Sequence, residues 1–215
     1  MKEFLISIFS GAIGGLFVYF YQKFDENRKS KNIIANKINS EKRTVPKDII
    51  YSLDVGTNIE KVKDIFGNPK FSTKINETEL YGEGPIFTIN IYKFEDCEIT
   101  IFHNDNNIQG FIIKPYIDGK FEFERFDSES TNLYLGEYIV DDSFSESSEI
   151  EYHFSMRSSW FGIVEYYGRI GNYNYYCYFG ECEYYENGPK LKDLKGNVIY
   201  GYGIASNKTF FKYYE

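Results

Sequence analysis

The hydrophobic pattern along the chain changes character twice. Residues Phe4–Tyr21 contain no charge, the following stretch to Pro46 is polar and charged, and the remainder alternates between apolar and polar positions. As a helix rising about 1.5 Å per residue, the apolar run is roughly 27 Å long, which matches the hydrocarbon core of a bilayer. The pattern predicts a transmembrane anchor over residues 1–22, a polar, partly helical linker over 23–46 and a folded domain after it.

The apolar run has the features of an uncleaved signal anchor. Bulky aromatic residues end the run where a signal peptidase site needs small ones, and Lys2 before it is followed by Glu3. Lys23, Arg28 and further basic residues lie on its C-terminal side, and such a bias places that side in the cytoplasm. We therefore expect a single-pass protein of a bacterial plasma (inner) membrane whose C-terminal domain is cytoplasmic.

Small residues recur every fourth position within the predicted anchor, at Ser7, Gly11 and Gly15. This spacing lets two membrane helices approach closely, so these residues form a candidate helix-association face and a homo-oligomer is one hypothesis. The alternative is that glycine is simply common in membrane helices. Either way the lipid bilayer is the expected partner of Phe4–Tyr21.

A short helix is signalled just after the linker. Thr57 is the expected N-cap, and Glu60 lies three residues later as in a capping box. Gly67 and Pro69 end the pattern, because glycine suits the left-handed position after a helix and proline cannot continue it. The spacing predicts a helix over residues 58–66 with one apolar face, made of Ile59, Val62, Ile65 and Phe66.

Alternating runs separated by turn residues follow as far as Phe126. Asp118-Gly119 is typical of a two-residue hairpin turn, so the strands on either side of it are expected to pair. Residues 47–126 are therefore predicted to form the short helix packed on an antiparallel meander. Its strands are expected at Ile86–Phe94, Cys97–His103, Ile108–Tyr116 and Phe121–Phe126.

The β pattern resumes after an acidic, serine-rich stretch. Residues 127–148 are expected to form an exposed excursion, either a docking loop or a disordered one, around a short strand at Leu133–Val140. Residues 127–215 then read as a tyrosine-rich β region continuous with the preceding domain. The fold class is α+β, predominantly antiparallel β, with a sandwich- or barrel-like arrangement. Further strands are predicted at Glu149–Met156, Phe161–Arg169, Tyr173–Phe179, Cys182–Glu186, Val198–Ile204 and Thr209–Tyr214.

Composition supports the β assignment and adds a candidate binding feature. Aromatic residues make up 20% of the chain, including 21 Tyr and 20 Phe, and both types favour strands. In the last third, tyrosines occupy both faces of their strands. Either both faces are buried, or one presents tyrosines to a partner, where the ring gives contact area and the hydroxyl a hydrogen bond. The candidate binding aromatics are Tyr166, Tyr173, Tyr175 and Tyr184.

Charge and motifs narrow the function classes. A net charge of -8 argues against a nucleic-acid partner. The sequence contains no nucleophile elbow, phosphate-binding loop or spaced metal-ligand motif, so no catalytic, cofactor-binding or metal residue is predicted. One alternative is an enzyme or metal-binding domain with a site near His153, Cys177 and Cys182. Glu181 and Glu183 alternate on one strand, where a solvated sheet face explains them better than paired catalytic carboxylates.

One stretch has a family resemblance. Its residues are Leu53, Gly56-Thr57, Val62, Phe66-Gly67-Asn68-Pro69, Ile99–Phe102 and Ile108–Ile112. With them, residues from about 53 to 113 resemble the BamE (SmpA/OmlA-like) family of small outer-membrane assembly proteins. The resemblance implies a helix ending in Gly-x-Pro before an antiparallel sheet, and a protein-interaction module without an active site. The chain departs from the family in lacking a lipobox cysteine, in its predicted cytoplasmic domain and in the roughly 100 residues that follow.

These observations lead to one leading hypothesis and two alternatives. The leading hypothesis is a membrane-anchored cytoplasmic binding, scaffold or sensor-effector module, non-catalytic, whose β-rich domain contacts a protein or a small ligand. The first alternative is the enzyme or metal-binding domain near His153. The second, which the family resemblance implies, is an envelope-assembly interaction module facing outside the cytoplasm.

Overall fold

The computed structural model describes residues 43–76, 86–123, 125, 133–155, 158–169 and 172–214. The predicted anchor, with Ser7, Gly11 and Gly15, and most of the predicted linker lie outside these residues. Within the described residues, no helix reaches the length and apolarity needed to cross a membrane. From Thr44 onward the chain forms one compact unit.

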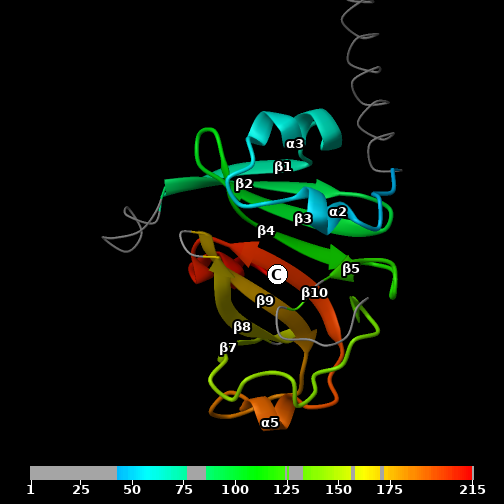
Figure 1. Cartoon of the computed structure of the whole chain (residues 1–215), viewed down its shortest axis with the longest axis vertical. Coiled ribbons are helices and arrows are strands. Elements are labelled where there is room, and N and C mark those ends of the chain that lie inside the picture. Colours follow the sequence, from blue (N-terminus) through cyan, green and yellow to red (C-terminus); the bar gives the residue numbers. More distant parts are fainter. Residues whose placement is uncertain are drawn as a thin grey trace, which may run out of the picture. The chain divides into compact units, whose positions relative to one another are not determined.

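Two antiparallel meanders join edge to edge into one eight-stranded sheet. Strand β4 of the first meander pairs with β10 of the second, which gives the order β1-β2-β3-β4-β10-β9-β8-β7 (Figure 1). The first meander consists of β1 (Phe71–Asn76), β2 (Ile86–Lys93), β3 (Cys97–His103) and β4 (Ile108–Pro115). The second consists of β7 (Glu149–Phe154), β8 (Ser159–Arg169), β9 (Asn172–Glu181) and β10 (Ile199–Ala205).

One face of the sheet, here called the α3 face, carries the larger core. Apolar residues lie opposite one another across six neighbouring strands, in the row Tyr92, Ile99, Ile113, Tyr202, Tyr178 and Ile163. Helix α3 (Ile59–Phe66) packs on this row, with the Phe66 ring 5.2 Å from that of Tyr92. Residues of α2 (Ile49–Ser52), α5 (Leu191–Leu194), β5 (Glu122–Phe123) and β6 (Leu133–Tyr134) join the same core.

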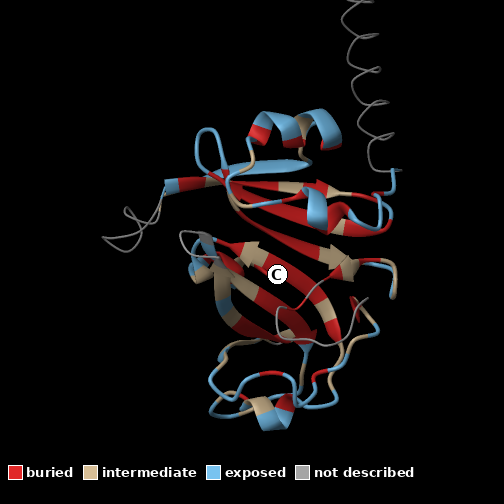
Figure 2. Cartoon of the chain, viewed as in Figure 1, coloured by how far each residue is buried: buried red, intermediate tan, exposed pale blue. Residues whose placement is uncertain are grey.

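The opposite face is covered by the C-terminal 3-10 helix η1 (Lys208–Tyr213) and is called the η1 face. The Phe210 ring stacks on Phe102 at 5.0 Å, and the Tyr214 ring stacks on Phe179 at 3.9 Å. Figure 2 shows the result, with buried residues concentrated in the central strands. Among the described strands, the eight therefore form a single sheet with a core on each face, where the pattern suggested a sandwich or barrel.

The predicted short helix is present, with two differences. Its N-cap is Asn58 rather than Thr57, because the Asn58 side chain accepts a hydrogen bond from the Glu60 N–H at 2.8 Å. Gly67 ends the helix with φ +76°, as expected of a glycine there. Ile65 is 45% exposed, because a helix this short turns only a narrow stripe, residues 59, 62 and 66, toward the sheet.

The predicted pairing across Asp118-Gly119 is wrong. β4 already has β3 and β10 as its two neighbours, so β5 pairs with β6 instead. The predicted strand Leu133–Val140 is reduced to Leu133–Tyr134. After those two residues the chain turns at Gly136, whose φ is +86°.

Two other predicted strands are absent. Residues 182–186 form no strand, and Thr209–Tyr214 is replaced by η1. The Asn207 side chain caps η1 by accepting from the Thr209 N–H at 3.0 Å, and the adjacent Phe210 and Phe211 are both buried. The pattern did not predict the elements α2, β1 and α5.

The acidic excursion is largely part of the domain. Leu133, Leu135, Val140 and Phe144 are all buried in the core of the α3 face. These spaced apolar residues hold residues 133–148 to the sheet, although serines and acids surround them in the sequence. Residues 127–132 lie outside the described part.

Candidate functional site

The second meander ends in an overhang. β7 pairs with β8 only as far as Val164, whereas β8 and β9 continue together to the pair Arg169 and Asn172. Three tyrosines lie on the η1 face of this overhang, with Tyr166 directly opposite Tyr175, and Tyr173 opposite Gly168. Tyr166, Tyr173 and Tyr175 are here called the tyrosine cluster.

The rings of the tyrosine cluster contact one another at the protein surface. The Tyr166 ring centroid is 4.5 Å from that of Tyr175 and 5.5 Å from that of Tyr173. Tyr166 is 58% exposed and Tyr173 45%, while Tyr175 is half-buried against the core of the η1 face. Mutual contact holds each ring in place without covering it, so the cluster presents ordered aromatic surface to solvent.

The neighbouring tyrosines on the α3 face, Tyr167, Tyr176 and Tyr178, are half-buried or buried. Tyr167 stacks on Tyr176 with centroids 4.2 Å apart, and the Tyr167 and Tyr178 hydroxyls are hydrogen-bonded. Tyr178 is fully buried, and this burial raises the pKa of its phenol well above the ordinary value. The sequence left open whether these strands are covered on both faces or present tyrosines outward. In the overhang, one face is packed and the other is exposed.

A groove of about 550 Å³ runs beside the tyrosine cluster. It lies between the loop that precedes β7 and the exposed part of β8. Its walls offer hydroxyl and carboxylate groups, and none of the described residues that line it is basic. The lining residues are Ser145, Ser147, Ser148, Glu149, Val164, Glu165, Tyr166, Tyr167 and Tyr175. It is called the serine–tyrosine groove below.

A buried arginine fixes the loop and the strand on either side of this groove. The Arg125 guanidinium donates to both carboxylate oxygens of Glu165, at 3.0 and 3.4 Å, and to the Ser143 carbonyl at 3.1 Å. It also lies 3.6 Å from the centre of the Phe144 ring. Burial alone would lower the pKa of Arg125, but its hydrogen bond and charge interaction with Glu165 raise it above the ordinary value. Arg125 therefore stays ionised.

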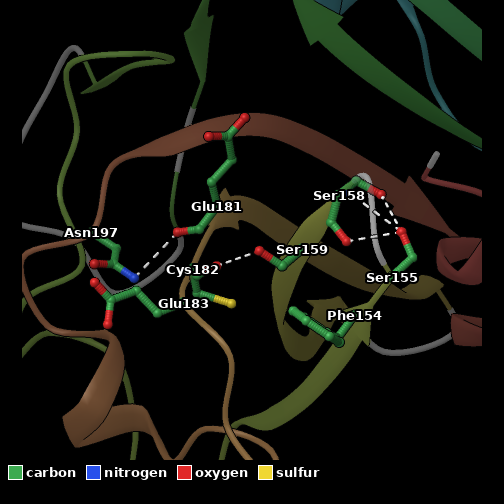
Figure 3. A pocket seen from close by; sticks show the side chains of 8 residues that line it. All are labelled: Phe154, Ser155, Ser158, Ser159, Glu181, Cys182, Glu183 and Asn197. Carbon is green, nitrogen blue, oxygen red and sulfur yellow. Dashed lines mark hydrogen bonds between the residues drawn. The ribbon is translucent and has the colours of Figure 1, made fainter.

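Tyr184 does not belong to the tyrosine cluster. It is 61% exposed, and its ring lies 4.6 Å from that of Phe154. Phe154 is one of the residues that line a second groove, of about 660 Å³ (Figure 3). In Figure 3 the carboxylates of Glu181 and Glu183, which both line this groove, point in different directions. Paired acid and base catalysis needs two carboxyl groups that face one bond, and this pair does not provide them.

His153, Cys177 and Cys182 are not brought together. Cys177 is buried in the core of the η1 face, whereas Cys182 packs against the core of the α3 face, and both thiols are free. Burial raises the pKa of both thiols, which disfavours the reactive thiolate. The His153 ring stacks on the Trp160 ring, with centroids 5.7 Å apart. Cys177 pairs with Val164, which lies four positions further along β8 than Trp160, so His153 and Cys177 lie at different positions along the sheet. Within the described residues, no group of three His, Cys, Asp or Glu side chains could hold a metal ion.

Sequence reasoning missed Arg125, Glu165 and the serines of the 145–148 loop. Glu165 interrupts an otherwise apolar run on β8, and such an interruption is the signal of a buried ionic partner. Comparisons of the chain with protein-family models, with curated proteins and with solved structures found no match. The resemblance of residues 53–113 to the BamE family therefore stays a prediction.

Proposed function

We propose that this chain is a membrane-tethered, non-catalytic binding module whose tyrosine cluster docks a protein partner. The observation that carries the proposal is the exposure of Tyr166 and Tyr173, two mutually packed rings on a strand pair that extends past its neighbour. Ordered exposed tyrosines are enriched in protein interfaces, because each buries much area and adds a hydrogen bond while losing little conformational entropy.

The surroundings of the cluster fit a docking role. The two meanders hold the rings on a rigid sheet, and Arg125 fixes the loop beside them through Glu165 and Ser143. Because the supporting strands are buried on the α3 face, binding at the cluster requires no rearrangement of the core. The proposed site is therefore preorganised, which lowers the entropic cost of association.

The tether is the second part of the proposal. Phe4–Tyr21 is proposed to anchor the chain in the plasma membrane with the domain in the cytoplasm, as the flanking basic residues indicate. An envelope-assembly role outside the cytoplasm, which the BamE-like residues imply, is the competing proposal. Reporter fusions after Glu215, one active only inside and one only outside the cytoplasm, separate the two. Exterior signal overturns the cytoplasmic assignment.

Site-specific photocrosslinking in cells tests the docking surface. A photoreactive phenylalanine placed at Tyr166 or Tyr173 of the full chain is expected to capture a discrete partner. Tyr51 and Tyr116 provide matched controls, because they are 47% and 51% exposed and lie in α2 and directly after β4, outside the overhang. Equal capture at the control positions, or none at Tyr166 and Tyr173, would contradict the proposal.

A further inference from the structure

The strand register shows which backbone N–H and C=O groups of β8 point outward at the sheet edge. The Ser155 N–H donates to the Ser158 carbonyl at 2.8 Å, so these residues form a hydrogen-bonded pair. Along an antiparallel ladder, hydrogen-bonded pairs alternate with pairs that are not hydrogen-bonded. Because the register of β7 with β8 is regular, the even-numbered residues of β8 up to Val164 direct their N–H and C=O groups at β7. The same alternation directs those of Tyr166 and Gly168 outward, past the end of β7.

These outward groups lie where β7 would continue if it were longer. Instead the chain leaves the sheet at a turn, in which the Ser148 N–H donates to the Ser145 carbonyl at 2.9 Å. No described strand pairs with the outward side of Tyr166 or Gly168. The space left by the missing continuation opens into the serine–tyrosine groove, which Tyr166 lines. Gly168, two residues further along β8, has no side chain that would hinder the approach of another backbone.

We propose that an extended, cationic segment of a partner protein adds to β8 in this groove, hydrogen-bonding to Tyr166 and Gly168 in line with β7. The inference rests on the proposed function and gives its binding mode, in which main-chain hydrogen bonds supply affinity and neighbouring side chains supply selectivity. A strand only a few residues long satisfies the two N–H and two C=O groups at this edge.

The charge of the groove selects a cationic segment. Its two charged lining residues, Glu149 and Glu165, are both acidic. Glu165 is already paired with Arg125, so the exposed Glu149 and the exposed Glu146 of the same loop are the carboxylates that a partner can reach. Lys208 pairs with Glu149 at 2.6 Å, but both side chains are exposed, so a partner can compete for this carboxylate. An arginine or lysine on the η1 side of the added strand would also lie near the exposed Tyr166 ring, whose face attracts cations.

The shape of the groove favours a single segment over the edge of a second copy. Serines of the 145–148 loop form one wall and β8 forms the other, so the space admits one extended chain between them. A whole domain edge approaching β8 would have to displace this loop, which Arg125 holds through Ser143.

Short synthetic peptides test the proposal on the full chain in detergent. The probe is acetyl-Val-Arg-Thr-Arg-Val-amide, with its Glu-for-Arg counterpart as the charge control. Two further versions carry N-methyl groups on alternate amides, one on the odd and one on the even positions. Amide hydrogen exchange is read at Tyr166 and Gly168, with the amides of β1 at the opposite sheet edge as the internal control.

The saturating arginine peptide is expected to slow exchange at Tyr166 and Gly168 at least about tenfold, with β1 unchanged. Only one of the two N-methylated peptides should still bind, since a strand pairs through alternate amides. Strand addition is overturned if both methylated peptides bind like the parent, or if no protection occurs. Equal protection by the glutamate peptide overturns the cationic assignment. Protection that rises with protein concentration alone shows pairing between copies instead.

The two proposals fail in different ways. If Tyr166 crosslinks to a partner in cells but the peptide does not protect the amides of β8, the strand-addition proposal fails and the docking-surface proposal stands. If the peptide protects these amides but no partner is crosslinked in cells, the proposed function fails, although the edge of β8 can still bind a strand.

Discussion

Replacing Arg125 with methionine is expected to destabilise the domain by about 3–5 kcal/mol, because it leaves a buried carboxylate without its counter-ion. The Arg125 side chain has no exposed surface, and Glu165 is only 11% exposed. Methionine keeps much of the aliphatic packing over the Phe144 ring, so the loss reports mainly on charge and hydrogen bonding.

The size of the effect follows from the contacts that are lost. Glu165 loses two charge-assisted hydrogen bonds, and the Ser143 carbonyl, the Ser143 hydroxyl and the Tyr138 hydroxyl each lose one from the guanidinium. Tyr138 keeps Asp141 and Ser143 as partners, so its share is small. Most of the loss comes from the desolvated Glu165 carboxylate, which in the variant has to bind a proton or draw in water.

A double-mutant cycle isolates the interaction between the two charged side chains. Arg125→Met and Glu165→Leu, singly and together, are compared by urea unfolding of the full chain, followed by the fluorescence of Trp160, the single tryptophan. The double variant is expected to recover most of the stability, since an apolar pair of similar volume replaces the ion pair, with a coupling energy of at least about 2 kcal/mol. The exposed pair of Lys195 and Asp142 is the control, and its removal should cost under about 1 kcal/mol. Additive losses, or a loss below about 1 kcal/mol in Arg125→Met alone, would refute this reasoning.

Three further predictions concern the core, the pH dependence and the anchor. Gly180→Ala should destabilise by about 1–3 kcal/mol in urea unfolding, because a Cβ there would lie 2.4 Å from the Phe161 ring. Burial raises the pKa of Tyr92 from its ordinary value of 10.0 to about 12, so its contribution to stability is full below about pH 10 and is lost as the pH rises toward 12. The stability of Tyr92→Phe should therefore fall less steeply across that window, and an unchanged slope would contradict this. Gly11→Leu and Gly15→Leu should weaken chemical crosslinking between copies of the full chain if the anchor associates, and undiminished crosslinking removes that hypothesis.

Local signals predicted the elements whose neighbours in sequence are also their neighbours in space. Residues 86–93, 97–103 and 108–115 are strands of one meander, and the capped helix before them packs on the same strands. Their alternation and turn residues are read from a few positions at a time. The errors begin where partners come from far away, as with β5, whose expected neighbour β4 is taken by β10 from the end of the chain.

The C-terminal segment shows the same limit. Residues 209–214 have the composition of a strand, but Asn207 caps a 3-10 helix there and its adjacent aromatic residues reach Phe102 and Phe179 on the η1 face. A segment that covers a sheet needs apolar residues but no alternation, so its pattern alone does not separate it from an added strand.

The position of η1 also decides which tyrosines are exposed. Alternation places Tyr166, Tyr175 and Cys177 on one face of the second meander, and nothing in the residues themselves separates the buried Cys177 from the exposed Tyr166. The difference arises because η1 packs over the centre of that face, against Phe102 and Phe179, while the overhang extends beyond β7 and leaves Tyr166 exposed. A covering element that stops short thus leaves an aromatic surface and an open strand edge at the same place. That coincidence is the physical basis for expecting the partner to bind there by both ring contacts and backbone hydrogen bonds.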